Sequence, residues 1–142
     1  ALNRDTLDKE FATLWYGTID HQSKRLTYCN AGHEPGLLLR NGKITPLDIG
    51  GMVTGVLADT EYEKGVVDLK KGDLLLLYSD GVTDAMDEHH RRYGREKLEY
   101  ALHEIASLSA QQGIDALLDR LAQHRGDRDP NDDITIVLVK VD

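Results

Sequence analysis

The hydrophobic pattern of the chain changes its period late in the sequence. Before this change, short apolar runs rich in β-branched and aromatic side chains alternate with turn residues. After it, apolar residues recur every three to four positions, first over residues 94–108 and then over residues 114–121. A β-branched run over residues 134–139 closes the chain. Strands followed by two helices and one last strand predict an α+β fold with antiparallel sheet, in which the helices cover one face.

Local signals predict several element boundaries. The pair Asn41-Gly42 stands between two short apolar segments and predicts a tight hairpin, because a type I′ turn needs positive φ at both central residues. Ser109 and Gln112 form a capping-box pattern before the second helix. Residues 11–19 are almost continuously apolar, which predicts a strand buried on both faces.

The composition excludes several classes of partner. The chain has 17 basic and 25 acidic side chains and a formal net charge of −8. This balance argues against nucleic-acid binding and against adhesion to anionic membranes. No apolar run reaches the ~20 residues that a membrane-spanning helix needs. Cys29 is the single cysteine, which excludes an internal disulfide and a cysteine-based zinc cluster. We therefore expect a cytoplasmic protein with no nucleic-acid partner and no segment inserted in a membrane.

Two acidic clusters lie at the ends of the two most apolar predicted strands. Asp80 follows the leucine-rich strand, and Asp84 comes one helical turn later if a helix begins at Gly81. Asp132 and Asp133 come directly before the last strand. If these two strands are antiparallel neighbours, the end of one meets the start of the other. Asp80 and Asp132 would then converge.

Converging carboxylates at the edge of a core are typical of a metal site. Like charges repel, and a hard divalent cation relieves the repulsion. Oxygen ligands without paired histidines or thiolates favour Mg²⁺ or Mn²⁺ over zinc. An acid at a strand end also fits a plain turn or a helix N-cap, as Ser79 or Asp80 would provide. The residues leave this alternative open for each cluster alone, whereas the pair favours the metal site.

Two further motifs allow both a structural and a functional interpretation. The segment His89-His90-Arg91-Arg92 is a basic island in an acidic protein. It is either a solvated loop or a contact for a phosphorylated or acidic partner. His33 stands in a turn-rich segment, where it either packs in the turn or binds an anion.

Three segments carry a family resemblance. They read NAGHEPGLLL from residue 30, GDLLLLYSDGVTDA from residue 72 and DDIT from residue 132. In this order they resemble the PPM (type 2C) metal-dependent Ser/Thr protein phosphatases, and most of all the SpoIIE/RsbU-like bacterial branch. The resemblance implies an antiparallel β-sandwich flanked by helices, the αββα layers of that family. Residues 1–142 would form a single partial phosphatase domain.

The resemblance also implies a site. In the family, aspartates hold two Mn²⁺ or Mg²⁺ ions, and a metal-held water attacks the phosphorus. Carried over by motif, Asp80 and Asp132 are the metal ligands, and Asp84 matches a position associated with a third, weaker ion. Gly81 and Asp133 would support these ligands without binding metal themselves. No catalytic side chain beyond the metal-held water is implied.

One departure from the family pattern bears on activity. Relatives carry, upstream of the position of Leu2, a segment with a Gly-Asp motif whose aspartate bridges the two metals, and this chain has no match to it. We therefore expect the C-terminal, larger part of the catalytic domain, with little or no activity by itself. Missing strands would expose apolar surface and sheet edges and favour self-association.

By analogy with this branch, the substrate would be a phosphorylated anti-sigma-factor antagonist in bacterial stress or sporulation-type signalling. His33 would contact this substrate, and an N-terminal sensor domain would precede the catalytic domain in the parent protein. Two other interpretations stay open. One is a non-enzymatic, phosphatase-like regulatory module that acts by binding a partner. The other is an unrelated β-rich small-molecule binder with solvated acidic turns.

Overall fold

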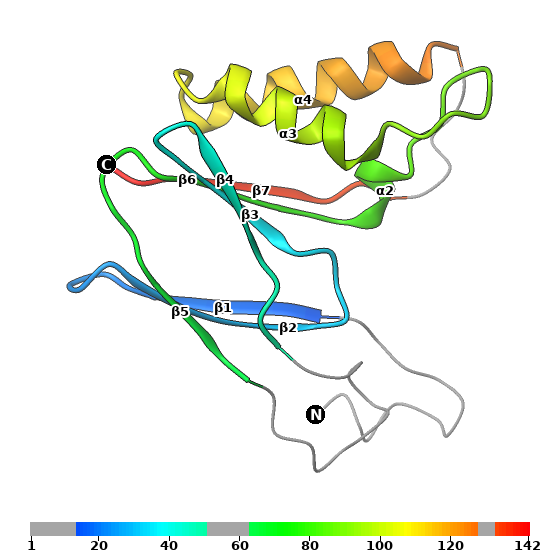
Figure 1. Ribbon diagram of the computed structural model, residues 1–142. Helices are drawn as coiled ribbons and strands as arrows, with labels where there is room; N and C mark the ends of the chain where they lie inside the picture. Colours follow the sequence, from blue (N-terminus) through cyan, green and yellow to red (C-terminus); the bar gives the residue numbers. More distant parts are fainter. Residues whose placement is uncertain (1–13, 51–62, 128–132) are drawn as a thin grey trace, which may run out of the picture. The chain divides into compact units, whose positions relative to one another are not determined.

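The computed structural model describes residues 14–50, 63–127 and 133–142 (Figure 1). The chain divides into two compact units, residues 1–36 with 46–71 and residues 37–45 with 72–142. Among the helices in the described ranges, none is long and apolar enough to cross a membrane.

The first unit is built on a three-stranded antiparallel sheet. Its strand order is β1-β2-β5, with bounds Leu14–Asp20, Arg25–Ala31 and Gly65–Asp68. On β2, Leu26 and Tyr28 are buried, and the indole ring of Trp15 stacks on the Tyr28 ring with 5.4 Å between centroids. Trp15 also donates from Nε1 to the carbonyl of Leu47 at 3.0 Å. The stacking and the hydrogen bond of Trp15 thus join β1 to β2 and to Leu47.

The predicted burial of the first strand on both faces is wrong. Residues 16–20 of β1 are exposed, and Tyr16 has 60% of its surface accessible. Among the described strands, β1 pairs only with β2, so it is the edge strand of its sheet. An apolar run therefore did not indicate a central strand here. Residues 11–13, also part of the predicted strand, lie outside the described residues.

The second unit contains nearly all of a four-stranded antiparallel sheet. The strand order is β4-β3-β6-β7, with bounds Lys43–Leu47, Gly36–Arg40, Leu74–Tyr78 and Ile136–Lys140. β6 lies between β3 and β7 and is antiparallel to both. The predicted hairpin joins β3 to β4, since Asn41 and Gly42 have φ angles of 50° and 77°.

The described residues of the second unit also form three helices. They are α2 (Asp80–Thr83), α3 (Gly94–Ile105) and α4 (Ala110–Arg125). α3 and α4 lie side by side over the sheet (Figure 1). The strands and helices share one buried cluster, formed by Leu37, Leu39, Leu74, Leu76, Tyr78, Val82, Ala85, Tyr93, Leu98, Ala101, Leu102, Ile105, Leu117, Leu121 and Leu138. The predicted α+β class and the order of strands and helices are confirmed.

The connection between α3 and α4 is held at both helix ends. The predicted capping box is present: Ser109 Oγ accepts from the Gln112 amide at 3.2 Å, and Gln112 Oε1 accepts from the Ser109 amide at 3.1 Å. From β7, Lys140 Nζ donates to the carbonyls of Ala106 at 3.3 Å and Leu108 at 2.7 Å. Carbonyls after a helix end have no helical partner, so this lysine satisfies groups that otherwise need water.

An ion pair ties β3 to the start of β6. Arg40 donates from Nε and Nη2 to the two carboxylate oxygens of Asp73 at 2.9 and 2.6 Å, and the Asp73 side chain is 2% exposed. The Asp73 carbonyl accepts from the Val141 amide at 2.9 Å. A two-point, charge-assisted contact of this kind offsets the cost of removing a carboxylate from water.

Arg40→Met in the intact protein tests this ion pair. Removing the guanidinium from a buried carboxylate is expected to lower the free energy of unfolding by about 3–5 kcal/mol. Arg120→Met is the control, because Arg120 pairs with Glu104 at the surface and its loss should cost about 1 kcal/mol or less. Urea denaturation of both variants provides the comparison, and equal losses would contradict a special role for Arg40.

Candidate functional site

The end of β6 and the start of β7 bring Asp80 and Asp133 to the same end of the sheet. The two strands are antiparallel, and their last register pair on this side joins Tyr78 to Ile136. Asp80 lies just beyond β6, and Asp133 lies just before β7. Antiparallel pairing of these two strands entered the expectation from sequence as a condition, and the structure shows this pairing. Asp132 lies outside the described residues.

Ser79 extends this pairing beyond the strands. Its amide donates to the Thr135 carbonyl at 3.0 Å, and its Oγ accepts from the Thr135 amide at 3.0 Å. The same hydroxyl donates to the Asp133 carbonyl at 3.4 Å. Ser79 occupies the N-cap position of α2, but its side chain makes no cap hydrogen bond. The hydroxyl thus fastens the segment after β6 to the segment before β7, a role that sequence reasoning missed.

Gly81 allows the two segments to touch. A Cβ atom at this position would collide with the carbonyl oxygen of Asp133. Gly81 is buried in the first turn of α2, so a side chain has no other direction to take. Close approach of two backbones is a physical reason for glycine inside a helix, where it is otherwise unfavourable.

The short helix α2 sets the spacing of Asp80 and Asp84. The Asp84 amide donates to the Asp80 carbonyl at 2.8 Å, so the two residues are one helical turn apart, as predicted. Asp80 is exposed, and among the described residues its carboxylate has neither a hydrogen bond nor an ion pair. Asp84 Oδ1 lies 3.7 Å from Nη1 of Arg92.

The chemistry of these donors fits a hard divalent cation. Asp80 and Asp84 present carboxylate oxygens on one turn of helix, and the Asp133 carbonyl lies against the same turn. Mg²⁺ and Mn²⁺ prefer such oxygen ligands. Within the described ranges, no three metal-ligating side chains are gathered in one place. The described acids could therefore supply part of a metal-binding set.

The basic island forms an ordered loop between α2 and α3. Asp87 Oδ1 accepts from the amides of His89 at 2.8 Å and Arg91 at 2.9 Å, and Asp87 Oδ2 accepts from Arg91 Nε at 3.0 Å. These hydrogen bonds, that of the Arg91 amide foremost, lower the pKa of Asp87 to about 2. His124 Nε2 lies 3.0 Å from the Arg91 carbonyl. Sequence reasoning missed Asp87, although an aspartate just before a turn is the usual acceptor for its amides.

His33 lies in the first unit, in a turn after β2. Asn30 holds this turn: its Oδ1 accepts from the His33 amide at 2.8 Å, and its Nδ2 donates to the His33 carbonyl at 2.9 Å. The ring atom Nδ1 lies 3.0 Å from the Glu34 carbonyl. These contacts place His33 in a turn, as the turn-packing interpretation expects.

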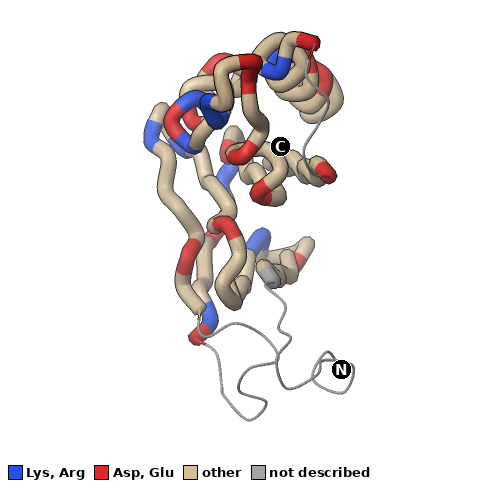
Figure 2. Tube along the Cα trace, turned by 90° about the vertical axis from the view of Figure 1, so that its right-hand side faces the viewer, with Lys and Arg blue, Asp and Glu red and all other residues tan. Residues whose placement is uncertain are grey.

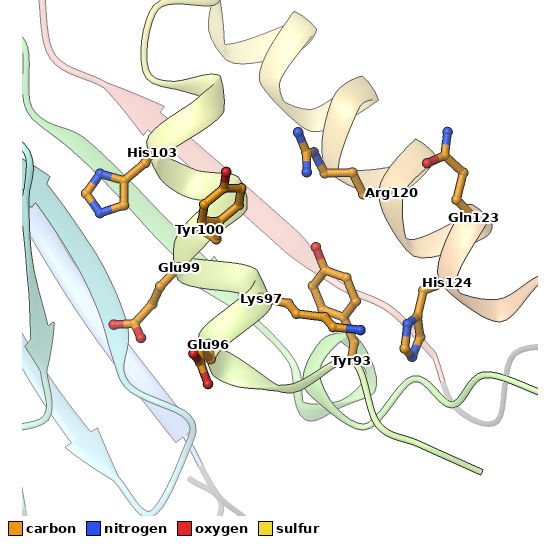
Figure 3. Close-up of a pocket in the computed structure, with 9 residues that line it drawn as sticks. All are labelled: Tyr93, Glu96, Lys97, Glu99, Tyr100, His103, Arg120, Gln123 and His124. Atoms are coloured by element: carbon orange, nitrogen blue, oxygen red, sulfur yellow. The ribbon is translucent and has the colours of Figure 1, made fainter. Parts of the chain in front are cut away.

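A groove of about 810 Å³ lies between α3 and α4, lined by residues of these helices and by Tyr93 (Figure 3). Tyr93 and His124 meet edge to face, with 5.3 Å between ring centroids. In this helical part of the unit, acidic and basic positions are interspersed (Figure 2). None of the described acids at the β6–β7 edge lines the groove, so it is distinct from the candidate metal site.

Gly81→Ala tests the contact between α2 and the segment before β7. The added methyl group meets the Asp133 carbonyl, and such overpacking is expected to cost about 1–3 kcal/mol of unfolding free energy. Helix propensity alone predicts the opposite sign, a gain of about 0.5–1 kcal/mol. Urea denaturation of the intact protein decides between them, and an alanine variant as stable as the parent would contradict the close approach.

Comparison with known proteins identifies the family. The family model described as Stage II sporulation protein E (SpoIIE) matches residues 1–142. Phosphoserine phosphatase RsbU of Bacillus subtilis is 30% identical over 132 residues, which are 92% of this chain and 39% of RsbU. The SiaA-PP2C domain of Pseudomonas aeruginosa matches with a TM-score of 0.81 and 22% identity, over 92% of this chain and 52% of that one.

A third similar protein is a phosphatase domain whose structure was solved after soaking with manganese. The phosphatase domain of SpoIIE from Bacillus subtilis, presoaked with manganese, gives a TM-score of 0.70 and 22% identity, over 92% of this chain and 56% of that one. The chain thus spans about half of these solved domains and less than half of RsbU. The structural likeness confirms the expected fold. The chain belongs to the SpoIIE family and has the fold of the PP2C phosphatases.

Proposed function

We propose that this chain is part of a metal-dependent protein phosphatase that acts on phosphoserine or phosphothreonine. The observation that carries the proposal is the junction of β6 and β7. There Ser79 and Gly81 hold the segment entering β7 against the first turn of α2, next to the exposed carboxylate of Asp80. Membership in the family of RsbU and SpoIIE supports the same reaction class.

In this proposal Asp80 and Asp132 bind two Mn²⁺ or Mg²⁺ ions, and Asp84 binds a third, weaker ion. The bound ions would supply an activated water and positive charge for the transferred phosphoryl group. The residues of this chain set the position of the ligands. Ser79 fixes the end of β6, and Gly81 lets the Asp133 main chain approach α2. In this proposal the acids of both clusters act at one site.

The substrate and the surrounding protein follow from the relatives. RsbU is a phosphoserine phosphatase by name, and we extend this substrate class to the parent of this chain. A phosphorylated anti-sigma-factor antagonist is the proposed substrate, with His33 as one of its contacts and an N-terminal sensor domain as regulator. Both units of the chain would belong to one catalytic domain, which other segments of the parent protein complete. A cytoplasmic location is part of this proposal.

Asp80→Asn in the intact protein tests the proposed site. Losing one ligand charge is expected to lower Mn²⁺-dependent hydrolysis of a phosphoserine peptide by more than about 100-fold. Asp115→Asn is the matched control, since Asp115 is exposed on α4 and hydrogen-bonded only to Gln111 among the contacts described. Unchanged turnover in the Asp80 variant would contradict the site, and a parent protein that binds its partner without any hydrolysis would favour a non-enzymatic module.

A further inference from the structure

A positive charge stands beside the candidate metal site. Nη1 of Arg92 lies 3.7 Å from Oδ1 of Asp84, and the Arg92 side chain is 67% exposed. Asp84 ends the helical turn that begins at Asp80. The guanidinium is therefore at the rim of the acidic cluster, where an incoming ligand can reach it.

The loop that carries Arg92 is held by backbone hydrogen bonds. Its two ends are joined, because the Tyr93 amide donates to the Ala85 carbonyl at 2.7 Å and the Asp87 amide donates to the Arg91 carbonyl at 2.9 Å. Met86 and Arg92 form an isolated antiparallel bridge between them. The position of Arg92 is thus fixed by backbone hydrogen bonds on both sides.

Arg92 differs from its two neighbours in the contacts of its side chain. On one side, Arg91 is engaged by the carboxylate of Asp87. On the other side, Tyr93 is buried in the hydrophobic cluster of the second unit. The side chains of Arg91 and Arg92 are both mostly exposed, 72% and 67%, but Arg91 is paired with Asp87 whereas Arg92 lies next to Asp84. Of the basic island, it is the residue that the fold presents to the site.

The position of Arg92 matters because both the chain and a phosphate ester are negatively charged. A phosphate ester is itself an anion, and it must approach a chain of net charge −8, in which the proposed metal ions offset only the carboxylates that bind them. A guanidinium at the rim offsets this repulsion. It also offers paired N–H donors that match phosphate oxygens in geometry, which a lysine ammonium does not.

We propose that Arg92 is a substrate-binding residue that contacts the phosphate oxygens of the phosphorylated substrate at the β6–β7 site. This inference rests on the proposed phosphatase function and adds to it a specific phosphate contact. In the free protein, the contact with Asp84 positions the guanidinium of Arg92. When phosphate binds, the guanidinium leaves Asp84 in part and contacts the phosphate oxygens. The remaining residues of the island serve the loop, with Arg91 holding its conformation.

The test compares Arg92→Gln and Arg92→Lys with the parent protein, and uses Arg95→Gln as the matched control. Arg95 lies three residues further on, in the first turn of α3. Its substitution by glutamine removes the same charge as Arg92→Gln. Three quantities are measured on the intact protein: the dissociation constant of inorganic phosphate by NMR titration, KM and kcat for a phosphoserine peptide, and Mn²⁺ affinity by calorimetry.

We expect Arg92→Gln to weaken phosphate binding and to raise KM by about tenfold, the effect of losing one charge-assisted contact. Arg92→Lys should recover part of this loss, because it keeps the charge without the paired donors. Arg95→Gln should change neither quantity. Mn²⁺ affinity should not fall in Arg92→Gln, since the variant removes a cation that competes for Asp84.

Two results would overturn the inference. One is phosphate binding and KM that are the same in Arg92→Gln as in the parent protein. The other is a loss of Mn²⁺ affinity that accounts for the change, because Arg92 would then act only through Asp84. Phosphate binding is measured without turnover, so the two proposals can fail separately. A protein that binds phosphate through Arg92 but hydrolyses no phosphoserine peptide would contradict the phosphatase function alone.

Discussion

The antiparallel pairing of β6 with β7 is the constraint on which the candidate site depends. The register that joins Tyr78 to Ile136 places residues far apart in the sequence at one sheet edge. Ser79 continues the pairing with its amide and its hydroxyl as far as Asp133. Shifting this register by one residue would turn every side chain of β7 to the other face. The same shift would break the hydrogen bonds of Ser79 with Thr135 and Asp133.

The rest of the second unit keeps this pairing rigid. β6 is a central strand between β3 and β7, and its residues Leu74 and Leu76 lie in the buried cluster shared with α3 and α4. At the other end of β6, Asp73 binds Arg40 through its side chain and Val141 through its carbonyl. Both ends of β6 are therefore fastened to neighbouring strands. Functional carboxylates placed on such a scaffold need little reorganisation when they bind a charged ligand.

Features with a local physical cause could be predicted from the sequence. The Asn41-Gly42 turn, the capping box of Ser109 and the helical turn from Asp80 to Asp84 each depend on neighbouring residues. The apolar character of β6 and β7 predicted two strands, whereas their pairing entered only as a condition, which the structure meets. Features that need distant partners were not predictable in this way. The edge position of β1, the Arg40–Asp73 ion pair and the hydroxyl contacts of Ser79 depend on tertiary structure, which a period of hydrophobicity does not encode.

The central claim is that the two acidic clusters form one metal site, and calorimetric titration of Mn²⁺ into the intact protein tests it most directly. Asp80→Asn, Asp132→Asn and the double variant are compared with the parent. Ligands of one site are not independent, so each single variant should weaken Mn²⁺ binding, and the double variant should lose less than the sum of the two effects. Binding that either single variant leaves unchanged, or effects that simply add, would contradict a shared site.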